Sequence, residues 1–369
     1  SDVTSRDPGE ATVRPPHLTF PAPTWRAAQT VTVTGQDDSP LLDGNQVTTI
    51  TIAVDDIASN DAFDLLADQT VAATTVDDDV AGFTVSETGG TTSVSESGTT
   101  DVLNVVLDAQ PTSNVVIDVS SGDTGEVTVS PATLTFTSGN WSTPQSVTLT
   151  GVGDSPLTDG DQITGILFSV DDALSYDPFD AVPDTTIQAT TLDIDVAGIL
   201  VTESGLDTTV GEGGSTDTFT VQLTAQPATA VTLTVVSDDT GEATVDQATL
   251  LFTTIDWNVA QTVTVTGIDD GQLVDGTQTT TVTIAVDDAA SDGEYAPVAD
   301  ETVSVTTTDD DVASFTVTES GGSTSVDEDG AGNTDTFTVD LDNQPGGNVV
   351  VDVRSGSQGE AQATPARLV

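Results

Sequence analysis

Acidic side chains recur in this sequence at a fixed distance. The triplet at 77–79 returns at 193–195, where Ile194 replaces the middle aspartate, and again at 309–311; 193 − 77 and 309 − 193 both give 116 positions. Carboxylates held close together repel one another and raise one another's pKa unless a cation lies between them. A hard divalent ion with six to eight oxygen ligands suits such a cluster, which favours Ca²⁺ over the smaller and stricter Mg²⁺. The spacing therefore predicts one recurring calcium site.

The same period governs the rest of the chain. Trp25, Trp141 and Trp257 are also 116 positions apart, and each precedes a Gln-Thr/Ser-Val-Thr-Val/Leu-Thr-Gly sequence. A fixed period indicates an array of structural repeats. Taking the acidic triplets as junctions, we expect four repeats. They are a partial first repeat at 1–80, complete second and third repeats at 81–196 and 197–312, and a partial fourth repeat at 313–369.

Within each repeat the hydrophobic residues alternate with polar ones, mostly threonine. In the second repeat this pattern predicts strands near 83–87 (continuing to 92–96), 102–108, 114–119, 127–136 with a break at Pro131, 145–150, 163–170 and 185–192. Each tryptophan is expected to begin the fifth strand of its repeat, which places Trp141 there as a cap on the core. Seven short strands in such a length predict an all-β fold: tandem seven-stranded immunoglobulin-like sandwiches in an elongated array.

The antiparallel order of these strands predicts where the acids lie. Loops after the first, third and fifth strands, and the end of the seventh, emerge at one end of the sandwich, here called the acidic end of the repeat. We predict the following calcium ligands there: Asp37, Asp38, Asp43, Asp77, Asp78 and Asp79 in the first repeat; Glu96, Asp123, Asp154, Asp159, Asp161, Asp193 and Asp195 in the second; Glu212, Asp239, Asp269, Asp270, Asp275, Asp309, Asp310 and Asp311 in the third. Asp101 and Asp217 are expected at the same end.

A simpler explanation competes with metal binding. Asp-Gly and Asp-Asp pairs are ordinary turn formers, so single aspartates could serve the backbone alone. A further set, at 55–56, 171–172 and 287–288, follows the sixth strand and so lies at the opposite end, where a solvated turn is favoured over a bridge to the preceding repeat.

Composition excludes several partners. The chain has 61 acidic residues against five basic ones and a formal charge of −56. Nucleic-acid backbones and anionic membrane surfaces need cationic protein groups, so neither is a partner. The charge implies a saline or calcium-rich medium, because otherwise the chain repels itself. There is no cysteine and no apolar stretch near the length of a membrane span, so we expect neither disulfides nor membrane insertion.

These features resemble the Calx-beta family. The resemblance rests on Val94-Ser95-Glu96, on Leu134-Thr135-Phe136, on the acidic loop after 147–151 and on the terminal triplet. It implies calcium binding at one end of each domain and a stiffened link to the next domain. By resemblance, Glu212, Asp269, Asp270, Asp309, Asp310 and Asp311 would be ligands. The sequence departs from the family at 123–126, where Asp-Thr-Gly-Glu replaces a tyrosine-bearing loop, and at Ile194.

The expected function is that of a structural repeat segment in a giant secreted surface or filament protein, an adhesin stalk or fibre, rather than an enzyme. Its expected partners are neighbouring repeats, with head-to-tail copies joined by strand donation as a further possibility. Both ends fall inside a repeat and methionine is absent, which favours an internal segment. The alternative is a module that binds carbohydrate, through carboxylates and Trp141, or ice, through Thr-x-Thr strands. A glycosidase would use paired carboxylates, but His17 is the one imidazole and lysine is absent, which disfavours a Ser-His-Asp triad.

Overall fold

The computed structural model describes residues 1–328, 333–357 and 359–369. The chain divides into two compact units. The first contains residues 1–154 and 161–194, and the second contains 155–160 and 195–369. The described residues contain strands and short 3₁₀ turns but no α-helix. This confirms the all-β fold predicted from the alternating pattern.

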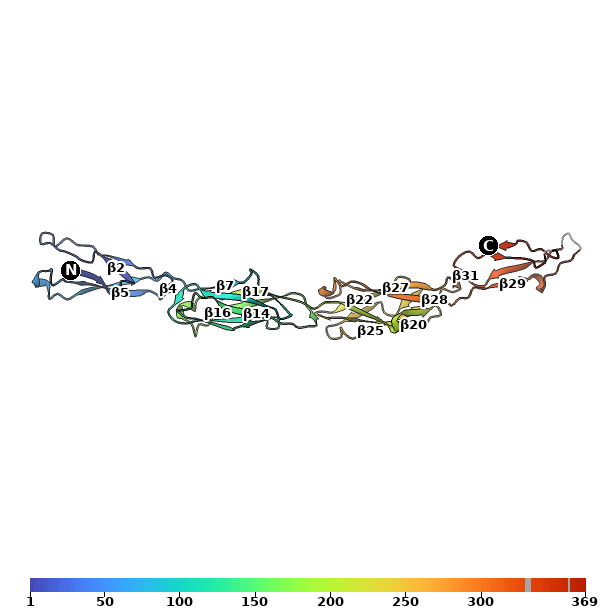
Figure 1. Ribbon diagram of the computed structural model, residues 1–369, viewed down its shortest axis with the longest axis horizontal. Helices are drawn as coiled ribbons and strands as arrows, with labels where there is room; N and C mark the ends of the chain where they lie inside the picture. The colour runs from blue at the N-terminus through green and yellow to red at the C-terminus, as the bar shows by residue number, and fades with distance from the viewer. Residues whose placement is uncertain (329–332, 358) are drawn as a thin grey trace. The chain divides into compact units, whose positions relative to one another are not determined.

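The third repeat forms a complete two-sheet sandwich in the second unit. One sheet has the strand order β18-β20-β25-β23 and the other has the order β19-β28-β27-β22-β24. The strands are β18 (Ile199–Glu203), β19 (Thr208–Gly211), β20 (Thr216–Leu223), β22 (Val231–Ser237), β23 (Ala243–Val245), β24 (Thr249–Phe252), β25 (Gln261–Gly267), β27 (Gln278–Val286) and β28 (Glu301–Thr308). Neighbours such as β20 and β25 run antiparallel, whereas β19 pairs in parallel with β28. Figure 1 labels β20, β22, β25, β27 and β28 of this sandwich.

The second repeat forms the corresponding sandwich in the first unit, with sheet orders β12-β14-β9-β7 and β13-β11-β16-β17-β8. Its strands are β7 (Phe83–Glu87), β8 (Ser93–Ser95), β9 (Thr100–Leu107), β11 (Val115–Ser121), β12 (Val127–Ser130), β13 (Thr133–Phe136), β14 (Gln145–Gly151), β16 (Gln162–Val170) and β17 (Thr185–Leu192). The break at Pro131 is confirmed, since β12 and β13 lie in different sheets. The first predicted strand likewise divides, because β7 and β8 also join different sheets.

The partial repeats contain fewer strands. The first repeat has β1 (Asp2–Ser5), β2 (Ala11–Arg14), β3 (Thr32–Gly35), β5 (Gln46–Ala53) and β6 (Gln69–Thr75). The fourth repeat has β29 (Phe315–Glu319), β30 (Phe337–Leu341), β32 (Val351–Asp352) and β33 (Arg367–Leu368).

Alternation along the strands builds each core. In β25, Val263 and Val265 are fully buried, and the threonines that alternate with them are more exposed. Phe219 and Phe252 fill the space between the sheets of the third repeat. Burying one such side chain stabilises the fold by roughly 1.5–3 kcal/mol, so the apolar positions alone fix which face of each strand points inward.

The tryptophans lie outside the strands that they were expected to begin. Trp141 is in the turn before β14 and Trp257 is in the turn before β25. Both indole rings are partly buried against their cores, as expected for a cap. The backbone carbonyl of Trp141 accepts a hydrogen bond from the Leu107 N–H at 3.0 Å, and Trp257 does the same for Leu223. Their turns therefore hold the end of a neighbouring strand.

Three pairs of two-residue strands connect consecutive repeats, and none of them was predicted from the alternating pattern. In the first unit β4 (Leu41–Leu42) pairs in parallel with β10 (Gln110–Pro111). In the second unit β15 (Leu157–Thr158) pairs with β21 (Gln226–Pro227), and β26 (Leu273–Val274) pairs with β31 (Gln344–Pro345). Each pair joins the loop after the predicted fifth strand of one repeat to the segment that follows the predicted second strand of the next.

Among the described residues no helix has the length and apolar character needed to cross a bilayer.

Candidate metal centre

Four connecting segments bring five carboxylates to the acidic end of the third repeat. Glu212 directly follows β19, Glu242 directly precedes β23, and Asp311 lies beyond the end of β28. Asp270 and Asp275 lie on either side of the short strand β26. Because neighbouring long strands are antiparallel, these loops emerge together, as the sequence predicted.

The five carboxylates form two groups that share one member. One oxygen from each of Glu212, Asp270 and Asp311 lies within 4.8 Å of the others, and the same holds for Glu242, Asp270 and Asp275. Asp270 therefore belongs to both groups. An arrangement of this kind could hold two cations with Asp270 bridging them.

Glu212 is the most informative member of these groups. Its side chain is only 1% exposed, yet neither carboxylate oxygen accepts a hydrogen bond from the described part of the chain. One buried oxygen in each of Glu242, Asp275 and Asp311 likewise has no hydrogen-bond donor there. A buried anion without a partner is costly, because it loses its water without replacement. A cation between these oxygens would remove that cost.

The pKa shifts agree with this geometry. Burial, followed by the negative charges of Asp270 and Asp309, raises the pKa of Glu212 to about 7. The pKa of Glu242 is also raised, by burial and then by Asp275. Burial and the neighbouring Asp309 raise the pKa of Asp311. Each raised pKa means that the protein disfavours the negative form in the absence of a compensating positive charge.

Asp309 has a different task. Its carboxylate accepts hydrogen bonds from the backbone N–H groups of Gly276 at 2.8 Å, Asp311 at 2.7 Å and Asp275 at 3.1 Å. These bonds, the one from Gly276 first, lower its pKa. Asp309 therefore ties the loop that follows β26 to the chain leaving β28. In the first repeat, Asp77 holds Asp43, Gly44 and Asp79 in the same way.

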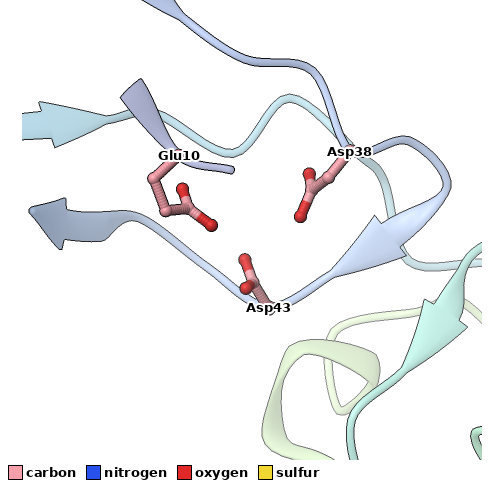
Figure 2. Close-up of side chains that lie close together, drawn as sticks. All are labelled: Glu10, Asp38 and Asp43. Atoms are coloured by element: carbon pink, nitrogen blue, oxygen red, sulfur yellow. The ribbon is translucent and has the colours of Figure 1, made fainter. Parts of the chain in front are cut away.

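The first repeat has its own carboxylate group. Glu10, Asp38 and Asp43 each place an oxygen within 4.8 Å of the others, and Figure 2 shows the three carboxylates turned toward one another. Burial and the charge of Asp43 raise the pKa of both Glu10 and Asp38. Glu10 immediately precedes β2 as Glu242 precedes β23, so the two repeats place the same residue type in the same position.

In the second repeat, Glu96 is the counterpart of Glu212. It is 7% exposed, and its Oε2 accepts a hydrogen bond from the Ile194 N–H at 3.3 Å. Burial raises the pKa of Glu96 to about 7, and the charges of Asp193 and Asp154 add to the rise. The Asp161 carboxylate accepts from the Asp193 N–H at 3.1 Å, so Asp161 braces the chain that leaves β17.

Several predicted ligands serve the backbone instead of a described carboxylate group. Asp123 and Asp239 each accept from an N–H two residues later, at 2.8 and 2.9 Å, so they close turns. Asp37 and Asp269 do the same at 3.0 and 2.7 Å. Asp78 and Asp310 belong to none of the groups found in the described residues.

Asp101 and Asp217 have carboxylates already bonded to serine, threonine and backbone donors of their own repeats. The opposite-end residues Asp171 and Asp287 each accept from the N–H two positions later, as expected for turns.

Glu10 and Glu242 were not among the ligands predicted from the sequence. Glu126 has the same position in the second repeat, since 126 − 10 and 242 − 126 both give 116. Each glutamate follows a glycine in a Thr-Gly-Glu or Pro-Gly-Glu sequence that is typical of a turn. The repeat period was the one signal that could have identified them, because turn propensity alone hides their role.

The chemistry of these groups is that of a hard cation. All the converging atoms are carboxylate oxygens, whereas softer metals prefer imidazole or thiolate. Three protein carboxylates per group leave room for backbone carbonyls and water, which Ca²⁺ accepts readily. The buried oxygens without donors fit such an ion.

Comparison with known proteins adds little to this account. No family model matches the chain, and no curated protein sequence matches it. Solved structures with a similar fold include the calcium-binding domain CBD12 of CALX1.1, at 15% identity, covering 55% of this chain and 80% of that chain, with a TM-score of 0.24. Surface layer protein SbsC, domains 4–9, matches at 14% identity over 86% of this chain and 40% of that chain, with a TM-score of 0.23. SbsC domains 4 and 5 match at 17% identity over 52% and 76%, with a TM-score of 0.24.

Proposed function

We propose that this chain is a structural repeat segment of an extracellular surface or filament protein, in which calcium ions at the acidic ends stiffen the joints between repeats. The observation that carries the proposal is Glu212, a buried carboxylate without a hydrogen-bond donor inside a ring of further carboxylates. Carboxylate groups at equivalent positions of the first and third repeats fit a joint between repeats better than a single active centre.

The position of the acidic end supports a role in joining repeats. In the third repeat, Asp270 and Asp275 flank β26, and β26 pairs with the fourth repeat through β31. Asp311 accepts a hydrogen bond from the Asn343 side chain of the fourth repeat at 3.0 Å. An ion held by Asp270, Asp275 and Asp311 would therefore fix groups that also contact the next repeat.

A non-catalytic role also fits the charge. The third-repeat site consists of carboxylates whose neighbours are other carboxylates, and the two ion pairs among the described residues are exposed and include none of its members. Trp141 and Trp257 are partly buried against the cores, which disfavours them as aromatic platforms for a carbohydrate, whereas Trp25 is 59% exposed. The structural role is therefore the one we propose.

Two measurements on the whole chain test this function. Calorimetric titration of the chelator-treated chain with CaCl₂ should reveal saturable binding, with dissociation constants of about 10⁻⁴–10⁻³ M as in other extracellular calcium modules. Small-angle scattering should then report a stiffer particle in calcium than in chelator. Scattering curves that coincide in the two conditions, despite saturable binding, would refute the stiffening role.

A further inference from the structure

The loop that carries two carboxylates of the third-repeat site also carries the edge to which the fourth repeat binds. Asp270 and Asp275 are separated by only four residues, and the last two of these form β26. The backbone carbonyl of Gln272 accepts a hydrogen bond from the Gln344 N–H at 2.6 Å, and the carbonyl of Val274 accepts from the Gly346 N–H at 3.1 Å. We call this pair of carbonyls the docking edge.

The docking edge is held by few other contacts. A two-residue strand has little stability of its own, because almost all strands in folded proteins are longer. On its C-terminal side, Asp309 holds the N–H groups of Asp275 and Gly276. On its N-terminal side, the Asp269 carboxylate accepts from Gly271 within the same loop. The loop thus depends on the carboxylates at its two ends for its shape.

The negative charges at those ends oppose the observed shape when no cation is present. Asp270 and Asp275 approach Glu242, and Asp270 also approaches Glu212 and Asp311. Repulsion between these groups is relieved if the loop moves outward. Such a movement shifts the carbonyls of Gln272 and Val274 away from the N–H groups of the fourth repeat.

We infer that calcium binding forms the docking edge, so that ion occupancy in one repeat controls backbone pairing with the repeat that follows. This inference rests on the proposed function and adds its mechanism: the joint is a two-residue β-pairing that the ion switches on. The first unit has the same arrangement. Its Pro40 lies between Asp38 and Asp43 in the sequence, and the Pro40 carbonyl accepts a hydrogen bond from the Gln110 N–H at 2.7 Å.

Thermodynamic linkage makes the effect reciprocal. If calcium strengthens the pairing by a given factor, the paired fourth repeat strengthens calcium binding in the third repeat by the same factor. Residues 344–346 therefore influence the ion affinity of a site to which they contribute no carboxylate. A site independent of the pairing would show no such dependence.

The test is residue-resolved hydrogen exchange on the whole chain, in saturating CaCl₂ and in chelator. Protection of the Gln344 and Gly346 amides should fall about fivefold or more in chelator, the lower range of common coupling energies. Amides of β25, in the core of the third repeat, should keep their protection. Asp270→Asn should lower the Gln344 protection even in calcium, whereas the charge-matched Asp288→Asn, at the opposite end, should not.

The reciprocal arm uses Gly346, which has no positive φ and tolerates a Cβ at ordinary contact distances from Asp275 and Val274. Gly346→Pro removes the N–H donor, and Gly346→Ala keeps it. The calcium midpoint for protection of the Asp275 and Gly276 amides reports the third-repeat site locally. We expect this midpoint to rise in the proline variant by the same factor as calcium raises the protection of the Gln344 and Gly346 amides in the parent chain. In the alanine variant the midpoint should stay unchanged.

The outcomes separate the inference from the proposed function. Saturable calcium binding with unchanged Gln344 and Gly346 protection would overturn the inference and leave calcium binding intact. Equal midpoints in Gly346→Pro and Gly346→Ala would overturn it as well. Absence of calcium binding in the titration would overturn both proposals.

Discussion

Replacing Glu212 by glutamine should change stability in opposite directions with and without calcium. The substitution keeps the size of the side chain, removes one charge and leaves the other carboxylates in place. Glu212 is 1% exposed and has a pKa of about 7. A carboxyl whose folded-state pKa is raised stabilises the folded state fully only below its unfolded-state pKa, and that advantage is lost as the pH rises toward the folded-state value.

The magnitude follows from the shift. The rise of the Glu212 pKa from its ordinary value of 4.5 to about 7 corresponds to about 3 kcal/mol. Screening by nearby water reduces this free energy, so about 1–2 kcal/mol is expected. In chelator at pH 8, Glu212→Gln should therefore raise the free energy of unfolding of the third repeat by about 1–2 kcal/mol. At pH 4.5 the variant and the parent chain should be nearly equal.

Calcium should reverse this order. An ion at 100 times its dissociation constant stabilises the folded state by about 2.7 kcal/mol, and the variant should gain much less because it has lost an anionic ligand. The assay is urea unfolding with pulsed hydrogen exchange, read on peptides from β25 and β27. A variant that is less stable than the parent in chelator at pH 8, or that gains as much from calcium, would refute the reasoning.

Three further predictions concern the carboxylate site and the core of the third repeat. Because protonation of Glu212 competes with the ion, calcium affinity of the third repeat should fall below pH 7 by up to about tenfold per pH unit, and titrations at pH 6 and pH 8 that agree would contradict this. Glu242→Gln should lower the calcium affinity of the third repeat, because Glu242 belongs to the group with Asp270 and Asp275. Asp239→Asn keeps the oxygen that accepts a hydrogen bond from the Gly241 N–H, so it should leave the affinity within about twofold of the parent chain. Calorimetry that found the larger loss of affinity in Asp239→Asn would count against the assignment. Phe252→Ala should destabilise the third repeat by about 3–5 kcal/mol in both calcium and chelator, since it opens a cavity in the core, and a calcium-dependent loss in urea unfolding would be inconsistent with a purely apolar role.

Much of the fold was predictable because two periods coincide in the sequence. Alternation of Val263 and Val265 with threonine identifies a half-buried strand, and the 116-residue period assigns the same strand to the first and second repeats. Antiparallel order then places Glu212, Asp270 and Asp311 at one end. These steps depend only on burial and strand direction, which are properties that local sequence encodes well.

The remaining details depend on contacts that local sequence does not encode. Residues Leu273 and Val274 form a strand only because Gln344 and Gly346 of the next repeat supply N–H donors. Glu242 and Asp239 lie three positions apart in one acidic turn, yet one carboxylate joins the group and the other closes the turn. That choice is made by backbone geometry around Gly241, which composition does not reveal.

The most direct test of the account is a crystal structure of the chain grown with CaCl₂, with anomalous differences measured to locate the ion. We predict density within about 2.3–2.6 Å of carboxylate oxygens of Glu212 and Asp270, and a second peak between Asp270, Glu242 and Asp275. A well-ordered map without these peaks, in which protein donors or water alone satisfy the Glu212 carboxylate, would contradict the central claim.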